Sequence, residues 1–225
     1  MLTETFHLLT RPETWSGAAG LWTRVGQHLW YSLLAMAVTV VLAVPAGLAV
    51  GHTGRFRGLV IGLGGALRAL PSLGLLTFLA LAVPGATGHA VVPAVAVLVL
   101  LAVPPVLAGT AAGVESVDRD TVVAARAVGL SERQILLRVE LPLAAPMIVD
   151  GIRSAVLQVL ATATVCAYIG LGGLGRYVLD GLATRDYPTV LVGAGSVIVV
   201  ALVAEGVLAL VQRWSRPRMS TGGRG

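Results

Sequence analysis

Four charged residues interrupt the apolar stretches of this 225-residue chain and are the first candidates for chemistry. They are Arg68, Asp150, Arg153 and Glu205. If these stretches cross a membrane, each charge is costly and is expected to pair with another charge or to face a water-filled cavity. Asp150 and Arg153 are three residues apart and share a helix face. We predict a charge cluster in the inner half of the membrane, with Arg68 or Arg153 paired to Glu205. Separate charges that each extend toward the inner surface are the alternative.

A glycine-rich stretch, GLGGLG, places glycines at Gly170, Gly172, Gly173 and Gly175. Its spacing matches a dinucleotide-binding loop, but such a loop follows a strand and opens a βαβ unit. This stretch follows an apolar run instead. We interpret it as a tight turn at the outer end of a span, because glycine adopts backbone angles that other residues cannot reach. A docked protein could also approach the backbone closely there.

The chain contains no lysine, which excludes two kinds of chemistry. A phosphate-binding P-loop needs its lysine, and a Schiff-base enzyme needs a lysine amine. Any ATP and Mg²⁺ must therefore be bound by another chain. Asp150, Cys166 and His89 form no recognisable protease or transferase set, and the single cysteine excludes an internal disulfide. We predict no catalytic residue, no metal site and no cofactor on this chain.

The composition indicates that the bilayer is the main solvent of the protein. Hydrophobic residues make up 56% of the chain and charged residues 12%, against about 25% charged in a typical soluble domain. Mean hydropathy is +0.87. A helical span needs about 20 largely apolar residues. We therefore predict an all-α polytopic membrane protein. Five spans are expected, at Leu29–Val50, Gly58–Ala82, His89–Ala111, Pro142–Gly170 and Pro188–Val211.

The arginines predict how these spans are oriented. Ten lie in the loops of one side and four in the loops of the other, and the arginine-rich side is cytoplasmic. Residues 1–28, with Trp15 and Trp22, then form an external or interfacial segment, and Trp30 of the first span lies at the outer interface. Residues 212–225 form a basic cytoplasmic tail. A sixth span, made by dividing 142–170, is the alternative, but it would place the C-terminal arginines outside.

The second span contains a predicted kink. Pro71 lacks the N–H that a continuous helix would use, and the small residue Ser72 follows it. Small residues allow helices to pack tightly or to line a pathway. We predict that Pro71 and Ser72 bend this span or line a translocation path.

Between the third and fourth spans lies a polar segment, 113–141, in the predicted cytoplasm. Ser116 or Asp118 can cap a helix over 121–128. Gly129 can end that helix in the left-handed conformation. Ser131 with Gln134 then forms a capping box that starts a second helix over 132–139. The segment is therefore predicted to be helix, glycine turn and helix, leading into the next span.

This segment resembles the cytoplasmic signature loop of ABC importer permeases. The family pattern is Glu-Ala-Ala, three residues, Gly, nine residues, then Ile-x-Leu-Pro. The spacing matches throughout, although Val123 stands in place of the Glu and Val139 in place of the Ile. The resemblance implies that the loop docks on an ATPase. The residues that it assigns to docking are Val123, Ala124, Ala125, Gly129, Leu130, Val139, Leu141 and Pro142.

Three further segments resemble the osmoprotectant branch of that family, whose substrates are glycine betaine, choline and carnitine. They are ALPSLGLL, GIRSA and YIGLGGLGRYVLDGL. The resemblance implies a type I importer fold in a bacterial cell membrane. It also implies three protein partners: an ATPase subunit, a second copy or a paralogue of the permease, and an extracytoplasmic substrate-binding protein. No nucleic-acid partner is expected. A permease for another small solute such as an amino acid, a secondary transporter and a channel are the alternatives.

Overall fold

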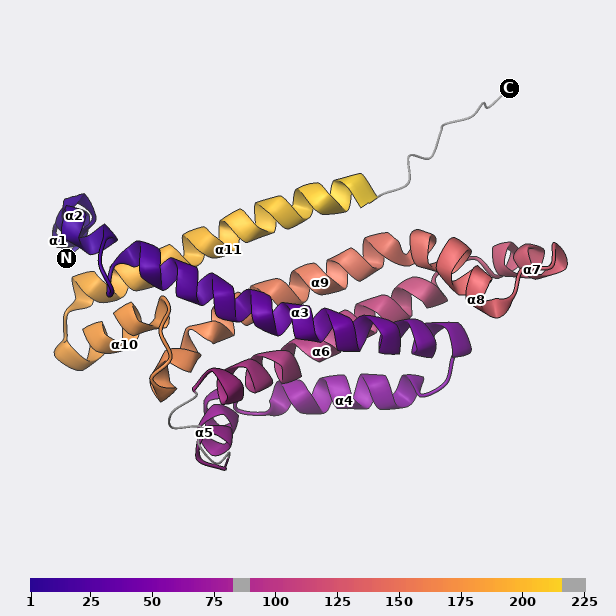
Figure 1. The fold of residues 1–225 in the computed structure, drawn as a ribbon, viewed down its shortest axis with the longest axis horizontal. Coiled ribbons are helices and arrows are strands. Elements are labelled where there is room, and N and C mark those ends of the chain that lie inside the picture. The colour runs from indigo at the N-terminus through magenta and orange to yellow at the C-terminus, as the bar shows by residue number, and fades with distance from the viewer. Residues whose placement is uncertain (83–89, 216–225) are drawn as a thin grey trace, which may run out of the picture.

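The computed structural model describes residues 1–82 and 90–215, and all regular structure in these ranges is helical (Figure 1). This confirms the predicted all-α class. The first half contains α1 (Leu2–Thr10), α2 (Pro12–Trp15), α3 (Leu21–Thr53), α4 (Arg57–Ala69), α5 (Ser72–Ala82) and α6 (Val91–Glu115). The second half contains α7 (Arg119–Ala127), α8 (Glu132–Ile135), a π-helical turn (Leu136–Glu140), α9 (Leu141–Ala163), a 3₁₀ turn (Val165–Ile169), α10 (Gly175–Thr184) and α11 (Tyr187–Ser215).

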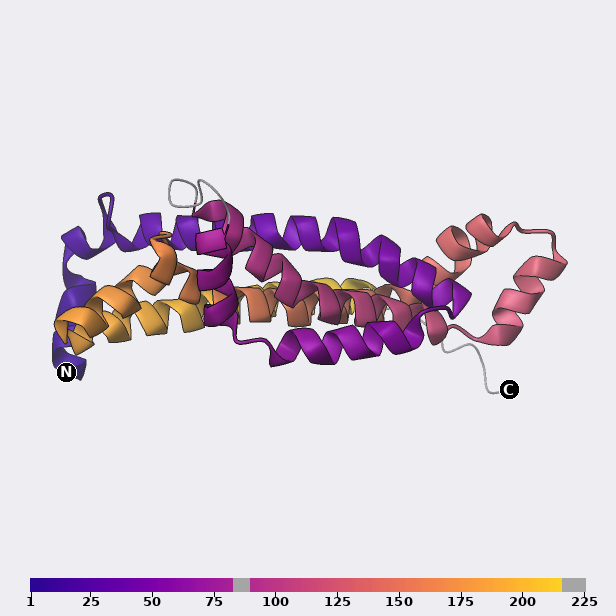
Figure 2. The same cartoon turned by 90° about the horizontal axis from the view of Figure 1, so that it is seen from below.

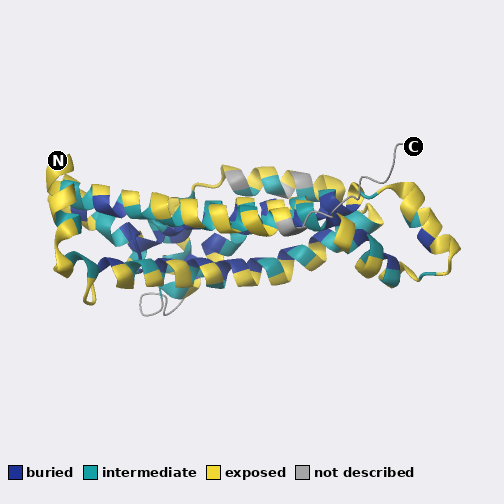
Figure 3. Cartoon of the chain, turned by 90° about the horizontal axis from the view of Figure 1, so that it is seen from above, coloured by how far each residue is buried: buried dark blue, intermediate teal, exposed yellow. Residues whose placement is uncertain are grey.

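The long helices lie along one axis, and the short ones close its two ends. Figures 1 and 2 place α1, α2 and α10 at one end, and α7 and α8 at the other. The helix α11 begins beside α10 and runs toward the α7 end. In Figure 3 buried residues follow the interior of the bundle, whereas α7 is largely exposed. The first residues and the end of α11 therefore lie at opposite ends, as an odd number of crossings requires.

The centre of the bundle is α6, which packs against α3 on one side and α9 on the other. Glycines make both contacts close. A Cβ added to Gly47 of α3 would lie 2.6 Å from the Thr110 Cβ of α6. A Cβ added to Gly109 of α6 would lie 2.9 Å from the Gly151 Cα of α9. Small residues allow such an approach, and membrane helices depend on it because lipid supplies no hydrophobic drive for their association.

Two adjacent prolines, Pro104 and Pro105, lie inside α6. Pro105 has no N–H to donate to the Leu101 carbonyl, four residues earlier. The Gln158 side chain of α9 donates to that carbonyl instead, with Nε2 3.1 Å from the oxygen. A side chain of a neighbouring helix thus satisfies the acceptor that the proline leaves open, as membrane proteins require.

Three described helices are long and apolar enough to cross a membrane: Leu21–Thr53, Val91–Glu115 and Tyr187–Arg213. A fourth crossing arises if Arg57–Leu67 and Ser72–Ala82 form one broken span. The 23-residue helix α9, which contains Asp150 and Arg153, is not among these helices. The five-span count and the side on which each end lies stay predictions.

Several predicted boundaries differ from the observed helices. The second span is not one kinked helix, because α4 and α5 meet at Pro71 with a 90° bend. The fourth ends as an α-helix at Ala163 and continues as a 3₁₀ turn. The first begins at Leu21, so residues 21–28 belong to the long helix. The predicted start of the third span, at position 89, lies outside the described residues.

Candidate functional site

The polar segment forms two short helices separated by a glycine turn, as predicted, although the first helix is Arg119–Ala127. Asp118 caps it by accepting from the Asp120 N–H at 3.1 Å. Gly129 has φ +87°, a conformation that glycine adopts without steric cost. The N–H of Gly129 donates to Arg126 O and that of Leu130 to Ala125 O. These two bonds form a Schellman motif, which fixes the end of α7.

The second half of the segment joins α9 through an unusual turn. Ser131 and Gln134 form the predicted capping box, with Ser131 N–H donating to the Gln134 side chain at 2.8 Å. Instead of continuing as an α-helix to Val139, the chain widens into a π-helical turn over Leu136–Glu140. The Leu141 N–H accordingly donates five residues back, to Leu136 O. The turn leads directly into α9, where Pro142 occupies the first turn of the helix.

The α7 helix and the residue that ends it carry exposed apolar side chains. Val123 is 59% exposed and Val128 78% exposed. Ala124 and Ala127 are exposed between them, whereas Ala125 is buried against the segment that follows. An exposed patch of valine and alanine on a rigid short helix is suited to contact with another protein.

The other predicted docking residues lie below this surface rather than on it. Leu130, Val139 and Leu141 are half-buried. Pro142 is exposed at the start of α9. These four positions therefore shape the turn and its connection to α9.

A chain of charged contacts, which sequence reasoning missed, fastens this segment to the end of α3. His52 Nδ1 lies 2.6 Å from Glu140 Oε2, and His52 Nε2 lies 3.3 Å from Glu132 Oε2. Arg126 of α7 binds both carboxylate oxygens of Glu132, at 2.7 and 2.9 Å. This hydrogen bond lowers the pKa of Glu132 and raises that of Arg126. No local spacing connects position 52 with position 140, so the sequence carried no signal for the contact.

The His52 contacts border a polar groove of about 660 Å³ at the α7 end of the bundle. Across it, Arg57 of α4 lies 3.4 Å from Glu115 at the end of α6. Arg119 and Val123 line the same groove. The groove therefore separates α7 from the ends of α3 and α6. The charged contacts of His52 bridge it.

The predicted charge cluster forms between α9 and α11. Both Arg153 nitrogens Nε and Nη2 bind the Glu205 carboxylate, the first at 2.9 Å. Arg153 Nη1 donates to the Gln212 side chain at 2.7 Å, and Gln212 Nε2 donates to Asp150 at 3.3 Å. The structure thus brings Asp150, Arg153 and Glu205 together through a glutamine that the sequence prediction omitted. The side chain of Arg68 lies outside the described part of the structure.

The glycine-rich stretch forms a turn at the α10 end, where it contacts α3. Gly170 and Gly173 have φ of +85° and +96°, so both need glycine. The Gly173 N–H donates to the Gln27 side chain at 2.9 Å. A Cβ on Gly172 would collide with that same amide. Gly175 is buried where α10 begins.

The chain bends at Pro71 as predicted, but the predicted kink is a break between two helices. Pro71 precedes α5 and accepts from the Leu75 N–H at 2.9 Å. Ser72 is the first residue of α5 and is half-buried. These positions bend the chain, and a role in a translocation path stays a prediction.

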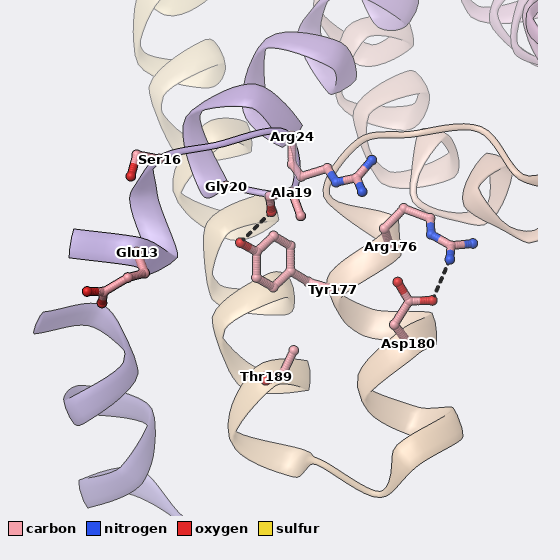
Figure 4. Close-up of a pocket in the computed structure, with 9 residues that line it drawn as sticks. All are labelled: Glu13, Ser16, Ala19, Gly20, Arg24, Arg176, Tyr177, Asp180 and Thr189. Carbon is pink, nitrogen blue, oxygen red and sulfur yellow. Dashed lines mark hydrogen bonds and ion pairs between the residues drawn. The ribbon is translucent and has the colours of Figure 1, made fainter. Parts of the chain in front are cut away.

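A second polar pocket, of about 340 Å³, opens at the α10 end (Figure 4). Tyr177 of α10 extends to the loop before α3, where its hydroxyl donates to Ala19 O at 3.0 Å. Burial raises the pKa of that hydroxyl. Arg176 pairs with Asp180 at 2.7 Å on the same helix. The Tyr177 bond holds the loop before α3 against α10.

The comparisons with known proteins agree with this arrangement. The family model "Binding-protein-dependent transport system inner membrane component" matches residues 39–219. The chain is 33% identical to the glycine betaine/carnitine/choline transport system permease protein OpuCB of Bacillus subtilis, over 87% of this chain and 88% of that protein. It is 34% identical to the choline transport system permease protein OpuBB of the same organism, over 85% and 86%.

Solved structures support the fold. The permease fold of the MetNI methionine ABC transporter, in an inward-facing conformation, matches with a TM-score of 0.72 at 17% identity, over 87% of this chain and 96% of that one. A chain of an amino acid ABC transporter matches with a TM-score of 0.67 at 19% identity, over 95% and 96%. The predicted type I importer fold is therefore confirmed.

Proposed function

Because the chain belongs to the family of binding-protein-dependent inner membrane transport components, we propose that it is the permease subunit of an ATP-driven importer for quaternary-ammonium osmoprotectants. The family matches four fifths of the chain, from 39 to 219. Relatives at 33% and 34% identity carry glycine betaine, carnitine and choline in their names. These names support the substrate class. The sequence offers few aromatic side chains for a cation–π site, since only 5% of the chain is aromatic.

We call α7 the coupling helix. The observation that supports its coupling role is its exposed apolar surface. The helix is fixed at its start by Asp118 and at its end by Gly129, and it presents Val123 and Val128 outward. A rigid helix with a small apolar face can insert into a groove of an ATPase subunit. That partner would bind ATP and Mg²⁺, because this chain lacks the lysine of a phosphate-binding loop.

Motion of the coupling helix would reach the spans through short connections. Only three residues separate the end of α6 from α7, and the π-helical turn joins α8 to α9 without a break. A displacement imposed by the ATPase would therefore move α6 and α9 together. In a pair of such subunits, this motion alternates access to the path between the two membrane sides.

At the opposite end, an extracytoplasmic binding protein would dock near α10 and deliver substrate. The pocket around Tyr177 offers charges of both signs, from Glu13 and Asp180 and from Arg24 and Arg176. The binding protein, rather than the spans, would select the substrate. The permease would supply the path and the coupling.

The test of the docking assignment is co-purification of the chain with a co-expressed ATPase subunit of a quaternary-ammonium importer. Gly129→Val places a branched side chain at φ +87°, which disfavours the turn by about 1–2 kcal/mol and should abolish recovery of the ATPase. Gly17→Val is the matched control, since Gly17 has φ +91° and equally open surroundings at the other end. Equal recovery of the ATPase with both variants would contradict docking at the coupling helix.

The substrate class is tested by uptake into vesicles that contain the complete complex and its binding protein. Labelled glycine betaine, choline and carnitine are expected to accumulate only with ATP. Accumulation of methionine or histidine in place of all three would overturn the substrate proposal and leave the permease assignment intact.

A further inference from the structure

His52 occupies an unusual chemical position at the last turn of α3. Both ring nitrogens face carboxylates, Nδ1 facing Glu140 at 2.6 Å and Nε2 facing Glu132 at 3.3 Å. A neutral imidazole has one N–H and can donate to one carboxylate only. The hydrogen bond is the one between Nδ1 and Glu140, and Nε2 lies within ion-pair distance of Glu132, so the ring of His52 lies between two acids.

The two carboxylates differ in their surroundings. The Glu140 side chain is 7% exposed and belongs to the π-helical turn before α9. The Glu132 side chain is 57% exposed and is also held by Arg126 of the coupling helix. A buried carboxylate that loses its partner is destabilised much more than an exposed one. His52 therefore satisfies a buried acid with one nitrogen and, with the other, contacts Glu132 of α8, which Arg126 of the coupling helix holds.

We propose that His52 is a positioning residue that fastens the coupling helix to α3, so that one displacement of this helix moves α3 as well as α6 and α9. This inference rests on the proposed coupling function. The covalent chain connects the coupling helix to α6 and α9 only, and α3 lies across the polar groove from it. The sequence of contacts Arg126, Glu132, His52 and Glu140 bridges that groove.

The neighbouring charges fit this role. Across the groove, Glu115 pairs with Arg57. The acids that contact the imidazole are Glu132 and Glu140. Arg119 lines the groove as well. The Arg126 guanidinium holds Glu132 through two hydrogen bonds and so fixes the distance between the coupling helix and His52.

The experiment measures substrate transported per ATP hydrolysed, in vesicles that contain the whole complex. His52→Gln keeps one donor and should lower this ratio about fivefold while the ATPase still co-purifies. His52→Arg keeps a cation with several donors and should restore the ratio to within about twofold of the wild type. His7→Gln, a change of an exposed histidine on α1, is the matched control and should leave the ratio unchanged.

The outcomes separate this proposal from the proposed function. An unchanged ratio in His52→Gln overturns the fastening role, and so does an Arg variant as impaired as the Gln variant, because a purely steric role would not be rescued by charge. If His52→Gln fails to assemble, Glu132→Gln weakens the contacts of residue 132 to His52 and Arg126 and leaves the buried Glu140 in place. It should lower the ratio about twofold to threefold, and an unchanged ratio there also refutes the proposal. Failure of the ATPase to co-purify with the wild-type chain would instead refute the proposed function.

Discussion

Replacing Gly109 by alanine tests whether the close contact between α6 and α9 holds the bundle together. The added Cβ would lie 2.9 Å from the Gly151 Cα, 3.2 Å from the Met147 carbonyl oxygen and 3.3 Å from the Gly151 nitrogen. All three atoms are backbone atoms, so no side-chain rotation can relieve the contact. Carbon atoms need about 3.5–4.0 Å, and the two helices must therefore separate locally.

The expected cost follows from two opposing terms. Overpacking at a tight contact costs about 1–3 kcal/mol, whereas alanine gains about 1 kcal/mol over glycine through its helix propensity. Gly109→Ala should therefore be about 1 kcal/mol less stable than the wild type. Gly195→Ala is the matched control, because Gly195 lies in α11 with no atom within 4 Å of an added Cβ. It should be up to about 1 kcal/mol more stable, since only the propensity term acts.

The assay is unfolding of the purified permease in mixed micelles with increasing denaturing detergent, followed by tryptophan fluorescence. The difference between the two alanine variants isolates the packing term, which we expect to be about 2 kcal/mol. Gly109→Val should lose more, because its branched side chain needs a wider gap. If Gly109→Ala and Gly195→Ala unfold at the same detergent fraction, the α6–α9 contact is not a tight one.

Two further predictions concern single hydrogen bonds. Gln158→Leu should lower the free energy of unfolding by about 1 kcal/mol, because the Leu101 carbonyl loses its donor. In a Pro105→Ala background the same change should lower it little, since the backbone of residue 105 then supplies an N–H. Equal losses in both backgrounds, measured by the same unfolding assay, would contradict the assignment. The depressed pKa of Glu132 means that its bond to Arg126 contributes to stability above the ordinary glutamate pKa and is lost as pH falls through the lowered value. Carboxylate ¹³C NMR of the complex should show Glu132 titrating at higher pH in Arg126→Gln, and an unshifted titration would refute the bond.

Features set by a few neighbouring residues were predictable from the sequence. The capping box of Ser131 and Gln134, the left-handed Gly129 and the cap at Asp118 all form as their spacing indicated. Each depends on backbone groups within about five residues, so the local sequence contains the whole interaction. The boundaries of long helices were less predictable. Apolar composition does not show whether a proline such as Pro71 bends a helix or divides it into two.

Contacts between distant segments were predictable only where an unpaired charge inside the membrane would cost much free energy. Charges within apolar runs must be compensated, and from that requirement we expected Arg68 or Arg153 to pair with Glu205; the structure shows the pair with Arg153. His52 and Glu140 raised no such expectation, because both lie near the ends of helices where water could satisfy them. Their contact depends on the π-helical turn, whose extra residue per turn the hydrophobic pattern does not reveal.

The charge cluster has a structural role, because it attaches α11 to α9. Among the residues of α11 whose burial is described, Val192 and Gly193 alone are buried, and both lie in its first turns, where Gly193 contacts α10. Farther along, the helix has no buried apolar residue to hold it, and lipid gives apolar surfaces no reason to associate. The bonds of Arg153 to Glu205 and Gln212 therefore fix the second half of α11 to α9. A pair of this kind specifies both the rotation and the register of the helix, which apolar side chains facing lipid cannot do.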